Sequence, residues 1–81
     1  MNAERAAMLL AFKSEDEILT RREIMTRAGV DNRHQFESLR AARYIFQREW
    51  GGAAVPREYG LTQDGKIKRE MHNVAENLRY G

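Results

Sequence analysis

The sequence predicts a single, mostly helical α+β domain in which a three-helix core is followed by a β-hairpin and a C-terminal helix. Three observations support this fold class. A helix-capping pattern begins at Thr20, residues 44–50 are rich in β-branched and aromatic side chains and lead into Gly51-Gly52, and residues 64–79 carry the strongest helical period of the chain. A length of 81 residues corresponds to one domain, spanning 1–81, with a small core.

Composition excludes several classes of protein. With 42% apolar and 32% charged residues, the chain matches a soluble globular domain and not a disordered segment. The absence of cysteine excludes disulfides and thiolate metal sites. The longest apolar run, 6–12, has seven residues, whereas a membrane span needs about 20, and its acidic flanks do not fit a signal peptide. We therefore expect a cytoplasmic protein of bacterial or phage type, with no membrane partner.

Positive charge is concentrated in the middle of the chain. The formal net charge is only +2, but residues 20–48 contain seven arginines against three acidic residues. These seven are half of the 14 basic residues, and none of them is lysine. Arginine is preferred over lysine for planar, bidentate contacts with phosphate or guanine, although a solvated arginine-rich face is the simpler alternative.

The first helix is predicted over residues 2–12, with Asn2 as its N-cap. Its apolar residues cover more than one face, which is typical of a helix packed between neighbours. Residues 17–19 are predicted to form a short strand or an extended connector.

The second helix is predicted over residues 21–28. Thr20 and Glu23 have the spacing of a capping box, in which each side chain binds the other residue's free N–H group. Gly29 offers the left-handed conformation that ends a helix, and Asp31 or Asn32 can cap the next one. Two helices joined by about three residues that include glycine form a helix-turn-helix.

The third helix, about 32–45, separates into two faces at ~100° per residue. The inward sector is apolar and holds Phe36, Leu39, Ala42 and Phe46. The outward sector has no aliphatic side chain larger than alanine and holds Arg33, His34, Glu37, Ser38, Arg40, Ala41 and Tyr44. Such a face can enter a nucleic-acid groove.

A hairpin is predicted next, from a strand at 44–50, a tight turn at Gly51-Gly52 and a return strand at 55–61. Pro56 cannot donate a backbone hydrogen bond, so it is expected at an edge or in the loop.

Thr62 then caps a last helix, about 64–79. Its apolar stripe has regular helical spacing and consists of Ile67, Met71, Val74, Ala75 and Leu78.

The order helix, short strand, helix, helix, hairpin, helix is that of a winged helix-turn-helix domain. The segment Tyr59-Gly60-Leu61-Thr62-Gln63-Asp64-Gly65-Lys66 resembles the "Y-x-L-T-x-x-G-[KR]" segment of MarR-like and PadR-like bacterial regulators, where the second strand of the wing meets the following helix. Residues 19–24, Leu-Thr-Arg-Arg-Glu-Ile, resemble the "L-T-x-x-E-[IL]" start of their second helix, and residues 28–31 resemble their turn. The resemblance spans about 5–70. Where these families carry a glycine before the first wing strand, this chain has Arg43.

The local roles within this segment have a physical basis. Leu61 is expected to anchor the strand end in the core, Thr62 to cap the last helix, and Gly65 to permit a close approach of neighbouring backbone.

The resemblance implies sequence-specific binding of double-stranded DNA by a small transcriptional regulator of the repressor type. The outward face of the third helix would lie in the major groove, and the first turn of the second helix would contact phosphates. The expected DNA contacts are Arg21, Arg22, Arg33, His34, Glu37, Ser38, Arg40, Arg48 and Arg57.

Three of these side chains have more specific expectations. Glu37 could accept a hydrogen bond from cytosine N4, or it could only orient an arginine. Arg48 and Arg57 flank the tip of the wing, where they would reach the minor groove or phosphates, while Trp50 is expected to pack partly under the wing.

A homodimer is expected, because a net charge of +2 gives weak binding to a single half-site. The first and last helices offer the available dimer surfaces, with Ile67, Met71, Val74 and Leu78 as the possible seam.

The competing interpretation is a winged helix used for protein docking, or a small phage-type inhibitor, with no direct role on DNA. An enzyme is not expected, because no serine lies at motif spacing from a histidine and no phosphate-binding loop is present. His34 and His72 lack the partners of a metal site. We expect no catalytic residues, no metal, no cofactor and no identifiable small-molecule effector.

Overall fold

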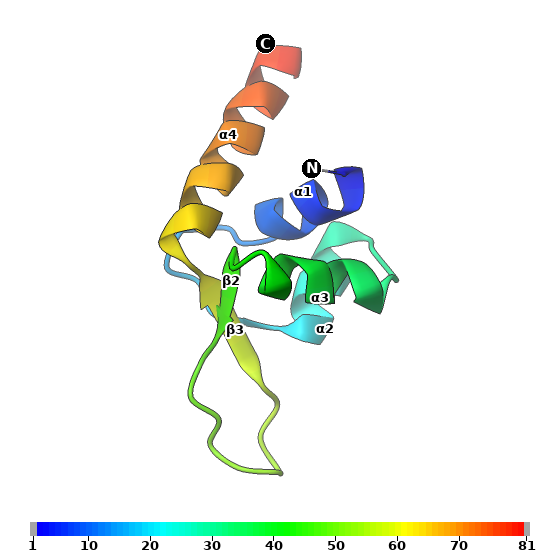
Figure 1. The fold of residues 1–81 in the computed structure, drawn as a ribbon. Helices are drawn as coiled ribbons and strands as arrows, with labels where there is room; N and C mark the ends of the chain where they lie inside the picture. The colour runs from blue at the N-terminus through cyan, green and yellow to red at the C-terminus, as the bar shows by residue number, and fades with distance from the viewer. Residues whose placement is uncertain (1, 81) are drawn as a thin grey trace.

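The computed structural model describes residues 2–80, with side chains as far as residue 75. Four helices and a three-stranded antiparallel sheet follow one another along the chain (Figure 1) as α1 Ala3–Leu10, β1 Leu19–Thr20, α2 Arg21–Ala28, α3 Arg33–Ala41, β2 Ile45–Gln47, β3 Glu58–Leu61 and α4 Gln63–Tyr80. The molecule is elongated, 44 × 24 × 20 Å, because α4 extends from one end and the loop between β2 and β3 extends from the other. No helix among the described residues is both long and apolar enough to cross a membrane.

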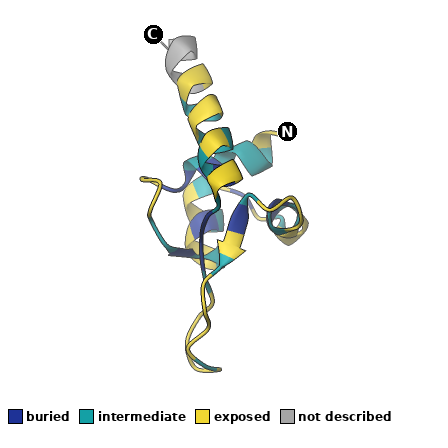
Figure 2. Ribbon diagram, turned by 60° about the vertical axis from the view of Figure 1, so that its left-hand side comes forward, coloured by how far each residue is buried: buried dark blue, intermediate teal, exposed yellow. Residues whose placement is uncertain are grey.

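The core lies where α1, α2 and α3 meet the sheet. Large side chains from all three helices and from the turn after α1 are fully buried there, among them Met8, Phe12, Ile24, Phe36 and Leu39. Because α1 packs against each of the other three helices, its apolar residues are needed on more than one face, as predicted. Figure 2 shows the buried residues gathered at this junction, while much of α4 and the β2–β3 loop is exposed.

The sheet has the strand order β1-β3-β2, so the last strand in the sequence lies in the middle. Leu19 pairs with Tyr59, and Ile45 pairs with Leu61. These pairs turn apolar side chains toward the helices, and Leu61 is buried at the strand end as predicted. The expected strand or connector at 17–19 forms a strand only from Leu19.

The caps predicted for α2 and α3 are confirmed. The Thr20 hydroxyl accepts from the Glu23 N–H at 3.2 Å, and the Glu23 carboxylate accepts from the Thr20 N–H at 3.1 Å. Gly29 has φ 68°, in the left-handed region where a β-carbon would be strained. The Asn32 side chain accepts from the His34 N–H at 3.1 Å and caps α3.

The third helix is shorter than predicted, because it ends at Ala41 and not near residue 45. Arg43 has φ 62°, and the Tyr44 N–H donates back to the Leu39 carbonyl at 3.1 Å, which closes the helix and turns the chain into β2. The left-handed residue is therefore an arginine at the position where the resembling families carry glycine. With the helix ended, Ala42 and Phe46 are exposed, and their predicted inward placement is wrong.

The hairpin is also shorter than predicted. Its strands have three and four residues, and the predicted tight turn at Gly51-Gly52 is part of a ten-residue loop, 48–57. Pro56 lies in this loop, which was one of its two expected places. It shortens the return strand because proline has no backbone N–H to donate to a neighbouring strand.

The start of α4 is fastened to the corner between α3 and β2. The Thr62 hydroxyl accepts from the Gly65 N–H at 3.0 Å and donates to the Arg43 carbonyl at 2.6 Å, which confirms the predicted cap. A β-carbon on Gly65 would collide with the Tyr44 carbonyl, so this position requires glycine, as predicted.

The apolar stripe of α4 lies largely in solvent. Ile67, Met71 and Val74 are 51%, 57% and 45% exposed. Leu78, the fourth residue of the predicted seam, falls outside the described side chains.

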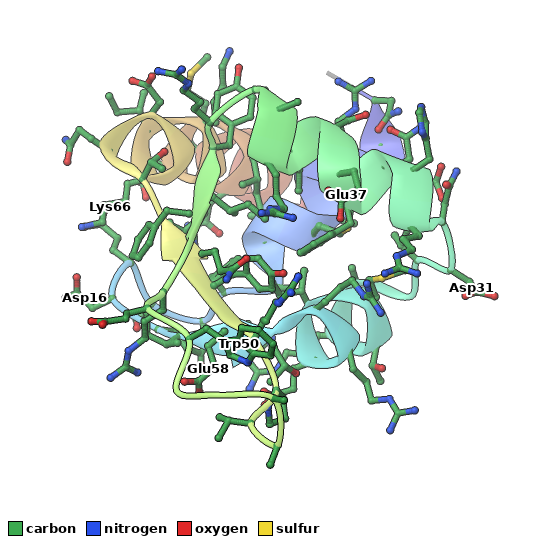
Figure 3. All side chains as sticks on the ribbon, turned by 60° about the horizontal axis from the view of Figure 1, so that its bottom comes forward. Asp16, Asp31, Glu37, Trp50, Glu58 and Lys66 are labelled. Atoms are coloured by element: carbon green, nitrogen blue, oxygen red, sulfur yellow. The ribbon has the colours of Figure 1, made fainter. Side chains whose placement is uncertain are left out.

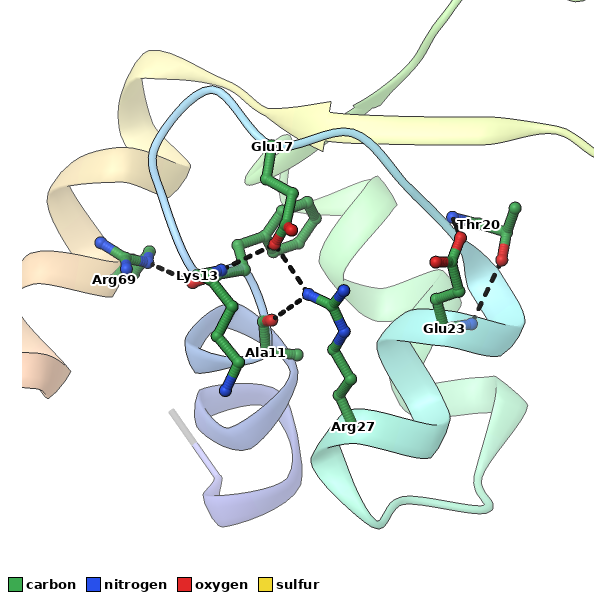
Figure 4. A network of polar contacts seen from close by, with 8 residues as sticks. Ala11, Lys13, Glu17, Thr20, Glu23, Arg27 and Arg69 are labelled. Carbon is green, nitrogen blue, oxygen red and sulfur yellow. Dashed lines mark hydrogen bonds and ion pairs between the residues drawn. The ribbon is translucent and has the colours of Figure 1, made fainter.

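A polar network fastens the loop after α1 to α2 and α4 (Figure 4). The Glu17 carboxylate accepts from the Lys13 N–H and from the Arg27 guanidinium, both at 2.8 Å. These contacts hold the pKa of Glu17 below its usual value. Arg69 on α4 donates to the Phe12 carbonyl at 2.8 Å, so the loop carries hydrogen bonds to both helices.

Candidate nucleic-acid interface

Four of the seven arginines of residues 20–48, together with Arg57, gather on one face of the molecule, formed by α2, α3 and the β2–β3 loop. The face carries two neighbouring hollows. One, of about 550 Å³, lies between α2 and α3; the other, of about 420 Å³, lies between the two helices and the loop. We call the second hollow the arginine cleft, because its walls include the side chains of Arg21, Arg22, Arg33, Arg40 and Arg57.

Three of these arginines are available to bind a ligand. Arg21, Arg22 and Arg33 line both hollows, and none of their side chains makes a hydrogen bond or ion pair with the rest of the described chain. Arg21 and Arg22 lie in the first turn of α2, where the helix dipole adds to their positive charge. Arg33 begins α3. Such an arrangement favours anionic groups.

Arg40 is engaged within the protein. Its guanidinium lies 5.4 Å from the centre of the Tyr59 ring and donates to Gln47 at 3.4 Å. It also pairs with the Glu37 carboxylate at 3.3 Å. Arg40 therefore has fewer free donors than Arg33, which lies at the opposite end of the same helix.

His34 and Ser38 lie on α3 but do not line the arginine cleft. The Ser38 hydroxyl donates to the His34 carbonyl at 3.1 Å, so its proton is used within the helix. The His34 side chain is exposed on the first turn. Both remain predicted contacts, beside the cleft and not within it.

The β2–β3 loop is closed by its own contacts. The Trp50 indole N–H donates to the Val55 carbonyl at 2.6 Å, and the Arg57 guanidinium lies 4.5 Å from the centre of the Trp50 ring. Arg48 pairs with Glu58 at 3.7 Å, at the base of the loop. Arg57 lines the arginine cleft, but Arg48 does not.

Several residues of this face were not predicted. Thr20, Pro56 and Tyr59 also line the arginine cleft, and Gln47 holds Arg40 from β2. Trp50 is 42% exposed, and its contacts with Val55 and Arg57 lie within the loop. In the sequence, the contact between Trp50 and Arg57 is indicated only by the presence of a tryptophan and an arginine seven residues apart.

The described part of the chain has no group of three or more histidine or acidic side chains placed to hold a metal ion. Among the described residues, the polar groups that line the arginine cleft are guanidinium groups, hydroxyls and one carboxylate.

Comparison with known proteins gives a similarity of fold. No protein-family model matches the chain, and no curated protein matches its sequence, so the resemblance to MarR-like and PadR-like regulators stays a prediction. Among solved structures, the chain is similar to Sso10a-2, a DNA-binding protein from Sulfolobus solfataricus, with a TM-score of 0.69. The match covers 99% of this chain and 83% of that one, with 12% sequence identity. The two chains therefore share an arrangement of helices and strands.

Proposed function

We propose that this protein is a winged helix-turn-helix protein that binds double-stranded DNA sequence-specifically and acts as a small transcriptional regulator. The observation that carries the proposal is the arginine cleft, which joins five guanidinium groups from α2, α3 and the β2–β3 loop on one face. The similarity to a DNA-binding protein supports it. The formal net charge is only +2, so this clustering makes the face more positive than the chain as a whole.

Each element of the face has a distinct role in this proposal. The exposed side of α3 enters the major groove, and the first turn of α2 contacts the phosphate backbone. The β2–β3 loop serves as the wing and brings Arg57 to the adjacent backbone. No step of chemistry is involved, and regulation follows from occupation of the site.

A homodimer is part of the proposal. Ile67, Met71 and Val74 form an exposed apolar stripe on α4. Burying this stripe against a second copy removes apolar surface from water. Two linked binding faces also compensate for the few phosphate contacts that one chain can make.

Replacing both Arg21 and Arg22 with alanine is expected to weaken binding to all duplex sequences alike. Two lost phosphate contacts should lower the slope of log affinity against log salt by about 2 units, since each contact contributes about 0.9. Fluorescence anisotropy with unrelated duplexes over a range of salt concentrations measures this slope. The matched control is Lys13→Ala with Lys68→Ala, which removes the same charge from side chains outside the face. Equal slopes for the two double variants, or no duplex binding by the wild type, would favour the protein-docking alternative.

Arg33→Ala is expected to act on sequence preference. Arg33 lies in the first turn of α3, the part of a recognition helix that approaches base edges, and its guanidinium has no partner among the described residues. Losing a bidentate contact with guanine should cost about 1–3 kcal/mol on a selected site and much less on a scrambled duplex at the same salt. An equal loss on both duplexes would make Arg33 a phosphate contact.

A further inference from the structure

One acidic residue lies among the arginines of the cleft. Among the described residues, Glu37 is the only acidic side chain that lines the hollow, beside five arginines. In Figure 3 it lies near the middle of the face, whereas Asp16 and Asp31 lie at the rim. A carboxylate here opposes the attraction that the arginines exert on phosphate, so it weakens binding to the DNA backbone.

The carboxylate of Glu37 is held in place by Arg40, one helical turn away. Its Oε2 atom lies 3.3 Å from a guanidinium nitrogen of Arg40. Arg40 is in turn fixed over the ring of Tyr59, which is buried and packs edge-to-face against Phe36 with ring centres 5.0 Å apart. The position of the carboxylate therefore depends on the core through a continuous series of contacts.

This single ion pair leaves acceptor capacity on Glu37. A carboxylate accepts about four hydrogen bonds, and the Glu37 side chain is 47% exposed with Arg40 as its hydrogen-bond partner among the described residues. The free lone pairs can accept a donor from a ligand that lies against α3.

The major groove offers only two kinds of base donor to such a carboxylate, the amino groups of cytosine and adenine. Guanine and thymine present acceptor oxygens at the same places, which a carboxylate repels. A fixed carboxylate on the groove-facing side of α3 therefore discriminates between bases both by attraction and by repulsion.

We propose that Glu37 determines the sequence specificity of this protein by accepting a hydrogen bond from the N4 amino group of a cytosine in the major groove. The inference rests on the proposed function, because it requires α3 to lie against base edges. In this arrangement the arginines around Glu37 supply affinity for the backbone, and Glu37 rejects sites that lack a donor at one base pair.

The test is a selection of bound fragments from random duplexes, carried out with the wild type, Glu37→Gln and Glu15→Gln. The wild type is expected to select a site with one cytosine that it prefers over guanine or thymine by about 5- to 150-fold, the discrimination of one good base contact. Glu37→Gln should lose that preference, shift toward adenine, and bind unrelated duplexes more tightly than the wild type. Glu15→Gln removes the same charge from the loop after α1, outside the cleft, and should select the wild-type site.

The outcomes separate the inference from the proposed function. If Glu37→Gln selects the wild-type site with unchanged discrimination, Glu37 does not read a base, although DNA binding stands. Duplex binding by the wild type with no base preference would overturn the inference and the sequence specificity of the proposed function, and would leave only binding to DNA. If the wild type binds no duplex at any salt concentration, both the proposed function and the inference are wrong.

Discussion

Gly65→Ala is expected to destabilise the domain by at least about 1–3 kcal/mol, the typical cost of forcing extra atoms into a packed site. A β-carbon at residue 65 would meet the carbonyl oxygen of Tyr44 and lie 2.8 Å from its carbonyl carbon. These atoms belong to the backbone and cannot rotate away, so α4 would have to move off the α3–β2 corner. For an 81-residue domain, whose total stability is on the order of 4–12 kcal/mol, such a loss is large.

The sign of the effect makes this prediction informative. In an open helix, replacing glycine with alanine stabilises by about 1 kcal/mol, because alanine is the better helix former. Urea unfolding followed by circular dichroism measures the change. The matched control is Gly51→Ala in the β2–β3 loop, where the nearest atom to a β-carbon would be 3.8 Å away, and its effect should stay within about 0.5 kcal/mol. A Gly65→Ala protein as stable as the wild type would show that α4 does not press on the corner.

Val74→Asp is expected to convert the proposed dimer into monomers and to lower affinity for a two-half-site duplex by about 10²–10⁴-fold, the gain that linkage of two sites provides. Val74 is 45% exposed on α4, so a charge there does not enter the core. The helical circular dichroism should therefore be retained, which separates this change from unfolding. Sedimentation velocity reports the oligomeric state, and binding to full and half sites reports the loss of linkage.

Asn73→Asp is the control for the charge itself. Residue 73 lies about 100° around the helix from Val74 and off the apolar stripe, so the Asn73→Asp protein should remain dimeric. A wild-type protein that sediments as a monomer at every concentration would remove the dimer from the proposed function. An unfolded Val74→Asp protein would instead place this stretch of α4 against the protein's own core.

The parts of the fold that depend on neighbouring residues were predictable from sequence. The limits of α2 follow from Thr20, Glu23 and Gly29, all within one helical length, and the structure has them where the pattern predicts. The cap at Thr62 was also predicted, because it acts at the start of one helix. The requirement for glycine at 65 depends on the distant backbone of Tyr44, and it was predicted from the resemblance of residues 59–66 to known regulators.

The predicted end of α3 and the predicted length of the hairpin were wrong, because contacts between segments far apart in the sequence determine both. The end of α3 is set by Arg43 in a left-handed conformation, which arginine seldom adopts and which Thr62 supports by donating to its carbonyl, 19 residues away. The helical spacing of apolar residues from Phe36 to Phe46 therefore predicted one continuous helix. The length of the hairpin also depends on distant segments, because β3 pairs with both β1 and β2 and does so over only a few residues on either side.

The candidate site was predictable in part for the same reason. Helical spacing alone places Arg33, Glu37 and Arg40 on one side of α3, and the capping pattern at Thr20 places Arg21 and Arg22 in the first turn of α2. The position of Tyr59 beneath Arg40, and hence the engagement of Arg40 within the protein, depends on the register of β3 against β2. Sequence spacing along one helix carries no information about that register.

The fastening of α4 at Thr62 has a mechanical consequence. The Thr62 hydroxyl and N–H both donate to the α3–β2 corner, to the carbonyls of Arg43 and Tyr44, so the base of α4 turns as one body with the end of α3. An 18-residue helix is a lever about 27 Å long. In a dimer joined through α4, the angle at this joint would set the separation and orientation of the two α3 helices. The distance between DNA half-sites would then depend on the rigid joint formed at Thr62 and Gly65, and not on the residues that face the DNA.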